Sequence, residues 1–137
     1  MRPVETRGVG NATAALTPVA WRQALRKKLL EIWEALVNER IKGGTNRQRA
    51  SAFMTLPSRS EYPEYYEIVT NPIDLSRIRA RIEVDWYPGV AQMASDVQLM
   101  LHNATHANKE GSPIYKDALV LENVWARNAP GASEVLR

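Results

Sequence analysis

The sequence predicts an all-α protein, a single domain of four helices packed as a bundle. Four segments repeat apolar residues at helical spacing, and no segment shows the alternating pattern of a strand. Three of the four segments also begin with a proline that follows a residue of the capping type. Each segment has one apolar stripe, so none is stable alone, and packing the four together buries every stripe.

The first expected helix runs from about residue 19 to residue 39. Thr17 and Pro18 provide a cap and a first turn, and Gly43 and Gly44 lie beyond its end. Its apolar face consists of residues three or four positions apart: Leu25, Leu29, Ile32 and Leu36. This spacing indicates a helix with one face turned to the core.

The second expected helix is shorter and lies in the stretch "NPIDLSRIRARI". We expect Asn71 to cap it, Pro72 to occupy the first helical position, and Asp74 to lie in the first turn, where the helix dipole favours an anion. Its apolar face would be Leu75, Ile78 and Ile82.

The third and fourth expected helices are separated by the stretch "NATHANKEGSP". The third opens after Pro88 and Gly89 and ends at Asn108, and the fourth opens at Ser112 and Pro113. The third would bury Val90, Met93, Val97, Met100 or Leu101, and Ala104, and the fourth Ile114, Ala118, Leu121 and Trp125.

The connection between the first two helices is unusually long. It takes about thirty residues, from Lys42 to Asn71, whereas bundle connections usually take two to eight. Loops of this length are usually functional or disordered. This one is rich in apolar and aromatic residues: Phe53, Met54, Leu56, Tyr62, Tyr65, Tyr66, Ile68 and Val69. We therefore expect it to pack against the bundle and to border a hollow at the end where the third helix stops.

Composition limits the possible functions. The 137 residues fit one domain, for which we expect residues 18–128, with flexible ends at 1–17 and 129–137. The absence of cysteine excludes a disulfide framework, a thiolate zinc site and a cysteine nucleophile. The sequence shows neither a secretory signal nor the roughly 18–20 apolar residues that span a bilayer, so we expect no membrane association.

The net charge of +3 conceals an uneven distribution. Residues 1–49 carry ten basic and four acidic side chains, whereas residues 50–137 carry eight basic and eleven acidic ones. A basic half can attract nucleic acid, but most charge runs only keep a helix face solvated, and both interpretations stay open. The candidate contacts to nucleic acid are Arg26, Lys27, Lys28, Arg47 and Arg49.

Two ordered motifs carry a family resemblance. A long loop ending in "LPSRSEYPEYYEIVTNPIDLSRI", followed by "NATHANKEGSPIYKDALVL", resembles a bromodomain. It is most similar to the bromodomains of polybromo and of the SWI/SNF-type remodelling ATPases, over about residues 20 to 127. The resemblance implies a left-handed four-helix bundle in which two inter-helix loops form an acetyl-lysine pocket. It also implies acetylated histone tails or other acetylated proteins as partners, chromatin targeting and a nuclear location.

The resemblance also implies roles for particular residues. Asn108 matches the asparagine that hydrogen-bonds the acetyl carbonyl, and Tyr65 the tyrosine that reaches the same oxygen through water. Phe53 matches the phenylalanine near the acetyl methyl, and Ile114 the gatekeeper. The remaining pocket residues would be Leu56, Pro57 and Tyr62 in the loop wall, with Ala52, Ala104 and Ala107 beside them.

The chemistry of these residues suits such a ligand. Acetyl-lysine presents a neutral amide, a methyl group and an apolar stem, which call for one good donor, an apolar floor and no strong anion. The Asn108 amide and the Tyr65 hydroxyl supply donors. Unmodified lysine would bring an ammonium into an apolar hole without a counter-charge, at a cost of roughly several kcal/mol. The poor fit of this ammonium would then make the pocket prefer acetyl-lysine over unmodified lysine.

Three departures from the family pattern support an alternative. Ala107 stands where the family usually has Tyr or Phe, Ala52 precedes Phe53 where many members have a Trp-Pro-Phe shelf, and Tyr62 replaces a leucine. Loss of an aromatic wall at Ala107 could widen or weaken the pocket, and the Tyr62 ring could refill part of the space. The alternative is a degenerate bromodomain that contacts protein or nucleic acid.

Some of these residues also have a plainer interpretation. An asparagine after a helix is often only a cap, and only one of the adjacent residues Tyr65 and Tyr66 is expected at the pocket. His102 and His106 could share a metal, but no third ligand is evident, so we expect neither metal nor cofactor. No paired carboxylates, phosphate loop or triad appear, so we expect a monomeric binding module and not an enzyme.

Overall fold

The computed structural model describes residues 17–129, and in this range the secondary structure is helical apart from one isolated bridge between Arg40 and Gln48. The helices are α1 (Pro18–Asn38), a short 3-10 helix η2 (Ser51–Phe53), α2 (Pro63–Ile68), α3 (Leu75–Glu83), α4 (Val90–Ala107) and α5 (Pro113–Asn128). The ends expected to be flexible lie outside the described residues, except for Thr17 and Ala129. None of the described helices is long and apolar enough to cross a membrane.

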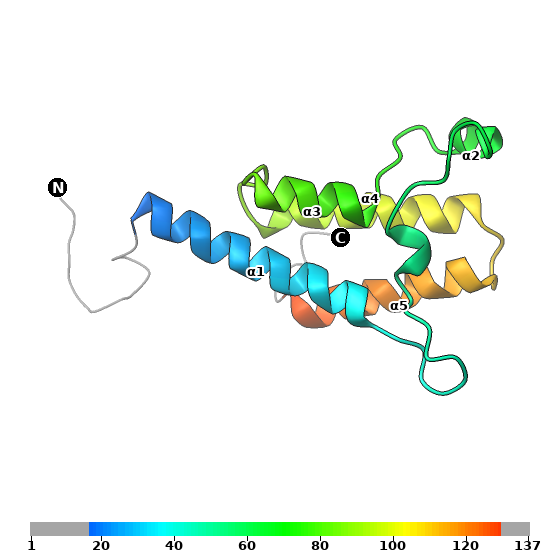
Figure 1. Ribbon diagram of the computed structural model, residues 1–137, viewed down its shortest axis with the longest axis horizontal. Helices are drawn as coiled ribbons and strands as arrows, with labels where there is room; N and C mark the ends of the chain where they lie inside the picture. Colours follow the sequence, from blue (N-terminus) through cyan, green and yellow to red (C-terminus); the bar gives the residue numbers. More distant parts are fainter. Residues whose placement is uncertain (1–16, 130–137) are drawn as a thin grey trace.

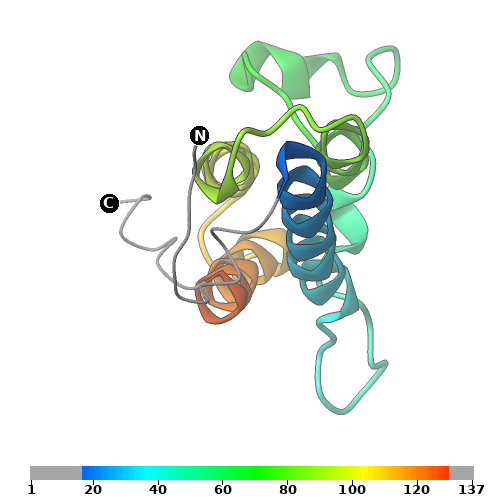
Figure 2. The same ribbon diagram turned by 90° about the vertical axis from the view of Figure 1, so that its left-hand side faces the viewer.

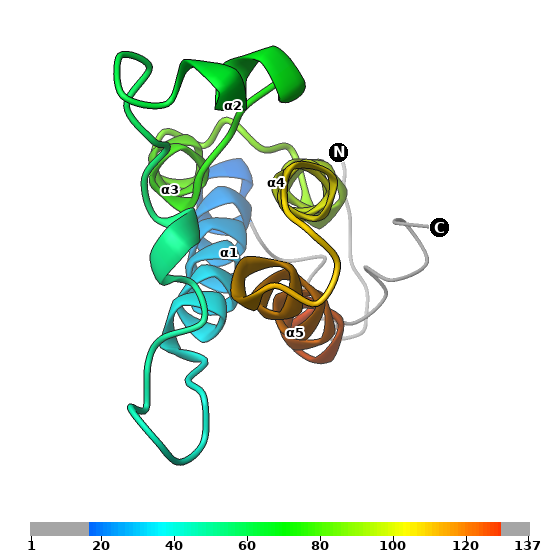
Figure 3. The same ribbon diagram turned by 90° about the vertical axis from the view of Figure 1, so that its right-hand side faces the viewer.

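Four of the helices form a bundle, as the sequence predicted. Figure 3 views the bundle along its length and shows α1, α3, α4 and α5 around a common centre. The core between them consists mainly of Leu29, Ile32, Leu36, Leu75, Ile78, Ile82, Met93, Val97, Leu121, Val124 and Trp125. These are largely the residues of the expected apolar stripes, because burying those stripes drives the helices together.

The first helix begins and ends within one residue of its predicted bounds. The hydroxyl of Thr17 accepts a hydrogen bond from the backbone N–H of Ala20 at 3.0 Å, so the predicted cap is confirmed. Leu25 is only partly buried, whereas Trp33, which was not assigned to the stripe, lies in the core. The Trp33 indole donates a hydrogen bond to the Leu75 carbonyl at 2.8 Å and so joins α1 to the start of α3.

The predicted start of the second bundle helix is wrong. Helix α3 begins at Leu75, and Asp74, not Asn71, is its N-cap, with the carboxylate accepting from the Arg77 backbone N–H at 2.8 Å. Asn71 instead lies in the loop, where its carbonyl accepts from the Asn103 side chain at 2.9 Å. Both residue types can cap a helix, but only Asp74 also accepts a tertiary hydrogen bond with its side chain, from the Leu56 backbone N–H.

The boundaries of the last two helices agree with the sequence. Helix α4 starts at Val90, directly after Gly89, and its C-cap is Asn108. Helix α5 starts at Pro113, and its N-cap Ser112 accepts from the Tyr115 backbone N–H. The two helices are antiparallel, and the end of α4, the turn and the start of α5 lie at one end of the bundle (Figure 1).

The long connection from α1 to α3 has structure that the sequence analysis missed. It first forms a tight loop over residues 39–49, where Gly43, Gly44 and Asn46 adopt positive φ. It then passes through η2 and the six-residue helix α2 before it reaches α3. In Figure 1 this connection lies at the end of the bundle that also carries the α4–α5 turn. Figure 2, seen from the opposite end, shows it behind the bundle helices and extending beyond them.

Candidate functional site

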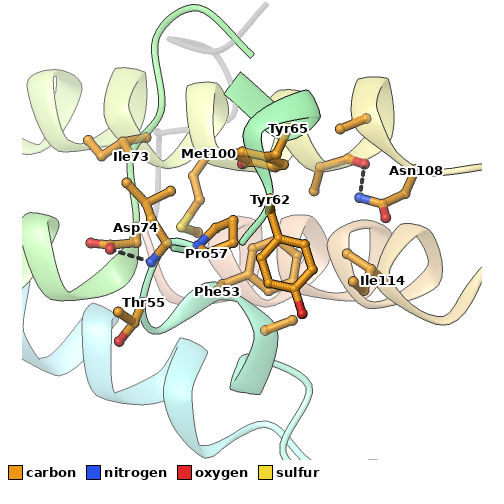
Figure 4. Close-up of a pocket in the computed structure, with 14 residues that line it drawn as sticks. Phe53, Thr55, Pro57, Tyr62, Tyr65, Ile73, Asp74, Met100, Asn108 and Ile114 are labelled. Carbon is orange, nitrogen blue, oxygen red and sulfur yellow. Dashed lines mark hydrogen bonds between the residues drawn. The ribbon is translucent and has the colours of Figure 1, made fainter. Parts of the chain in front are cut away.

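A cavity of about 310 Å³ opens at the end of the bundle covered by the long connection. Its walls come from η2 and the following loop, from α2, from the last turns of α4 and from the first turn of α5 (Figure 4). The ten residues proposed from the sequence all line it: Ala52, Phe53, Leu56, Pro57, Tyr62, Tyr65, Ala104, Ala107, Asn108 and Ile114. Thr55, Ile73, Asp74 and Met100 line it as well.

Asn108 lies where α4 ends and is only partly buried. Its side-chain Nδ2 donates to the Ala104 carbonyl at 2.9 Å, and its backbone N–H donates to the same oxygen at 3.1 Å. The carbonyl can only accept, which fixes the orientation of the amide. The Nδ2 group carries two hydrogens, and the helix end uses one. Asn108 is therefore both a cap and a potential donor to a ligand.

Two adjacent tyrosines on α2 have different surroundings. Tyr65 lines the cavity, and none of the hydrogen bonds within residues 17–129 involves its hydroxyl. Burial raises the pKa of Tyr65 above its usual value, with smaller contributions from Tyr66 and Asp74, so the hydroxyl stays protonated at neutral pH. The Tyr66 hydroxyl instead donates to the Pro57 carbonyl at 2.5 Å and ties α2 to the preceding loop.

Apolar side chains form the floor of the cavity. Phe53, Met100 and Ala104 are buried members of the core, and Ile114 packs against that core from the first turn of α5. Tyr62, by contrast, is 53% exposed at the start of α2, and Ala107 is partly buried. The floor is therefore continuous with the bundle core, whereas the rim contributes polar atoms.

A carboxylate also lines the cavity, which the sequence analysis did not expect. The Asp74 Oδ2 accepts from the Leu56 backbone N–H at 2.8 Å, and Oδ1 accepts from the Arg77 backbone N–H at 2.8 Å. Both oxygens thus have a partner from the chain. Figure 4 shows Asp74 on the side of the cavity away from Asn108. The carboxylate holds the loop wall to α3 and is not an open charge beside the amide.

The sequence offered signals for only some of the additional lining residues. Met100 precedes Ala104 by four positions, so helical spacing places both on one face, and that pattern could have identified it. The sequence places Asp74 in a helix turn, and no local pattern indicates its bond to Leu56, 18 positions earlier. Thr55 and Ile73 carry no motif of their own.

The basic side chains proposed for nucleic acid are largely engaged within the chain. Arg26 forms an ion pair with Asp85, with 2.6 Å between Nη2 and Oδ2. Arg47 and Arg49 both contact the carboxylate of Asp117, at 3.1 and 3.0 Å. The remaining two, Lys27 and Lys28, are exposed on α1. Three of the five proposed contacts are thus paired with carboxylates of the chain itself.

The two histidines of α4 are stacked, with ring centroids 6.2 Å apart. Within residues 17–129, no three side chains of the types His, Cys, Asp or Glu are grouped so that they could hold a metal ion. The stacking of His102 and His106 follows from their four-residue spacing on the exposed side of the helix.

Comparison with known proteins gives the family. The Bromodomain family model matches residues 36–120. The SWI/SNF chromatin-remodeling complex subunit snf22 of Schizosaccharomyces pombe is 38% identical over 106 residues, which cover 77% of this chain and 6% of that protein. The ATP-dependent helicase brm of Drosophila melanogaster is 34% identical over 100 residues, which cover 73% of this chain and 6% of that protein.

A solved structure has the same fold. The tandem bromodomain of Rsc4, in an acetylated form, matches with a TM-score of 0.70 and 29% identity, covering 74% of this chain and 41% of that one. The chain therefore corresponds to a small part of its remodeller relatives and to one portion of the tandem structure. The four-helix bundle, the cavity between its two loops and these matches together show that the chain belongs to the bromodomain family.

Proposed function

We propose that this chain is an acetyl-lysine reader that binds acetylated histone tails or other acetylated proteins and so targets chromatin. The observation that carries the proposal is the pairing of an apolar cavity with one uncommitted amide N–H of Asn108 at its wall. Membership of the bromodomain family and the acetylated form of the Rsc4 structure support it. The proposal assigns no catalytic step to the chain.

The ligand would enter with its acetyl group toward the apolar floor. The second hydrogen of Asn108 Nδ2 would donate to the acetyl oxygen, and the protonated Tyr65 hydroxyl would reach the same oxygen through a water. Phe53 would contact the methyl group, and Ile114 would lie beside the stem. Leu56, Pro57 and Tyr62 would form the loop wall, with Ala52, Ala104 and Ala107 completing the cavity.

Unmodified lysine would fit this cavity poorly. Its ammonium would lose water in an apolar site, at a cost of roughly several kcal/mol, unless a carboxylate compensated it. Asp74 is the carboxylate in the lining, and both of its oxygens already accept backbone hydrogen bonds. Selectivity for the acetylated form would follow because this carboxylate is held by the chain on the side of the cavity away from Asn108, where it compensates an ammonium poorly.

The biological context of the proposal comes from the relatives. They include chromatin-remodelling subunits and a transcription regulatory protein. We propose a nuclear location for this chain and affinities between micromolar and millimolar, since one small pocket supplies only about 4–8 kcal/mol. Avidity from neighbouring modules would then strengthen chromatin binding.

A second candidate is a bromodomain that has lost acetyl-lysine binding. Ala107 favours it, because a methyl group covers less of the ligand than an aromatic ring at the same position. In this case the fold would contact other proteins or nucleic acid through its surface.

A titration with matched peptides separates the two candidates. Acetylated and unmodified histone tail peptides of identical sequence would be titrated into the protein by calorimetry, after a peptide array has selected the sequences. We expect binding only to acetylated peptides. Equal binding to both forms, or binding to neither across the array, would contradict the reader and favour the second candidate.

A further inference from the structure

A buried carboxylate outside the cavity joins two of its walls. Asp117 on α5 is 1% exposed, and its Oδ1 accepts from Arg49 Nη1 at 3.0 Å and from Arg47 Nη2 at 3.2 Å. The Arg47 Nη2 atom also lies 3.1 Å from Oδ2. The arginines are 70 and 68 positions away in the sequence, so the contact is tertiary. Nothing in the binding scheme above uses these three residues.

Each end of this ion cluster is close in sequence to a wall of the cavity. Asp117 follows Ile114 by three positions, so both lie on one face of α5, one turn apart. Arg49 is followed by the buried Ala50 and then by η2, which carries Ala52 and Phe53. The cluster therefore connects α5, one turn after its lining residue Ile114, to the loop that leads into η2.

The loop before η2 is also held at its base. The Arg49 backbone N–H donates to the Glu39 carbonyl at 2.9 Å, and the Gln48 side chain donates to the Val37 carbonyl at 2.9 Å. These bonds fix the loop to the end of α1, whereas Asp117 fixes it to α5. In Figure 3 this loop extends away from the bundle beside the end of α1.

An ion cluster restricts the relative position of α5 and the loop more than apolar side chains would. Burying a carboxylate is costly, and apolar residues of similar volume often serve stability equally well. What the charged hydrogen bonds add is direction, because each arginine contacts the carboxylate through one terminal nitrogen and such a bond tolerates only a limited range of distances and angles. The cluster thus constrains the spacing between two chain segments more strictly than apolar contact would.

We propose that Asp117 is a positioning residue: by holding Arg47 and Arg49 it sets the spacing between Phe53 on η2 and Ile114 on α5. Its effect on ligand affinity rests on the acetyl-lysine function proposed above, whereas its effect on the loop does not. The residue touches no ligand and acts through the two arginines.

Asp117→Asn tests the proposal, because it keeps the volume and removes the charge. Asp96→Asn is the matched control: Asp96 is a poorly exposed carboxylate that pairs with Arg81 at 2.6 Å, twelve positions before Asn108 on α4, or about 18 Å along the helix. We expect Asp117→Asn to weaken acetylated-peptide binding roughly 2- to 30-fold, the range seen for coupling through packed networks, and Asp96→Asn to leave it unchanged.

Hydrogen exchange provides a readout that needs no ligand. The Phe53 N–H donates to the Ala50 carbonyl at 2.8 Å, and the Leu56 N–H donates to Asp74. In Asp117→Asn these amides should exchange faster relative to the α4 core than they do in Asp96→Asn. Uniform acceleration across the molecule in both variants would mean that Asp117 contributes to stability alone, and the proposal would be wrong.

A third variant covers the case in which Asp117→Asn does not fold. Arg47→Met, Arg49→Met and Asp117→Leu together replace the cluster by apolar side chains, which should restore stability. We expect the exchange of residues 50–56 to stay fast and affinity to stay low. If slow exchange of residues 50–56 and peptide affinity both return when stability is restored, the positioning role of Asp117 is wrong. If the unaltered protein binds no acetylated peptide, the reader function fails, and the exchange data still decide the role of Asp117.

Discussion

Asn108 makes two uses of one amide, since one hydrogen holds the end of α4 and the other is available to a ligand. Asn108→Ala should therefore weaken acetylated-peptide binding by about five- to 150-fold, because an unmade buried hydrogen bond costs roughly 1–3 kcal/mol. The loss of the bond to Ala104 should lower the free energy of unfolding by no more than about 1 kcal/mol. Calorimetric titration and chemical denaturation measure the two effects.

Asn128 offers a matched control for this substitution. Its Nδ2 donates to the Val124 carbonyl at 2.8 Å, the same four-residue bond at the end of α5, and it is also partly buried. Asn128→Ala should cost similar stability and leave binding unchanged. If Asn108→Ala unfolds the protein while Asn128→Ala does not, Asn108 mainly stabilises the fold. Unchanged binding in a folded Asn108→Ala variant would contradict the reader assignment.

Ala107 tests whether the cavity has room to spare. If its small side chain leaves the wall open, Ala107→Tyr should tighten binding of acetylated peptide or leave it unchanged, because the ring adds apolar contact with the ligand. A marked loss of affinity without unfolding would mean that Tyr62 already occupies the space. The double variant Ala107→Tyr with Tyr62→Ala should then regain the lost affinity, since residues that share a space are not additive.

At the scale of elements, Asp74 both caps α3 and holds the loop that carries Leu56. Its substitution by alanine removes the cap bond from Arg77 and the bond from Leu56 that holds the loop wall. We expect the free energy of unfolding to fall by about 1–3 kcal/mol, with about 1 kcal/mol from the cap. Peptide affinity should fall as well, because the Leu56 wall is released. Denaturation and titration of the same sample measure both.

Thr17→Ala is the control for the cap alone. Thr17 caps α1 through one bond to Ala20 and makes no contact with the cavity lining given above. Its loss should cost about 1 kcal/mol and leave affinity unchanged. Equal effects of the two substitutions on stability and binding would show that the bond from Asp74 to Leu56 does not hold the wall.

Helical periodicity correctly predicted the helices that bury an apolar stripe. It did not predict a short helix without a stripe, nor a helix start that depends on a contact between residues distant in sequence. The bounds of α4 and the caps at Thr17 and Ser112 follow from local chemistry. Helix α2 was missed because its six residues contain no buried side chain and so no stripe. The start of α3 was misplaced because Asn71 and Asp74 are both residue types that cap helices, and no local pattern shows that Asp74 also accepts a bond from Leu56, 18 positions earlier.

The candidate site was easier to predict than some of the helices. Eight of the ten proposed lining residues stand in two ordered motifs, and the long connection and the α4–α5 turn bring both motifs to one end of the bundle. The ion pairs between residues distant in sequence could not be predicted. Arg26 and Asp85, for example, are 59 positions apart, and no local pattern links them. The roles of the lining residues in binding stay predictions that the peptide titrations test.

At the scale of the whole molecule, the charge of the N-terminal half is less available than the sequence suggested. Arg26, Arg47 and Arg49 are paired with carboxylates from the acidic half of the chain. The two halves therefore neutralise each other in part through the fold. Lys27 and Lys28 remain as exposed members of the proposed nucleic-acid contact.

The salt dependence of duplex DNA binding measures how many of these five side chains meet phosphate. Each phosphate contact contributes about −0.9 to the slope of log K against log salt concentration, because it releases counterions. With only the two lysines available, the slope should be no steeper than about −2, and Lys27→Ala with Lys28→Ala should abolish it, whereas Arg47→Ala should not change it. Five contacts would give about −4.5. A slope of that size would mean that the arginines leave Asp85 and Asp117 for DNA, and that the loop held by Asp117 is released when DNA binds.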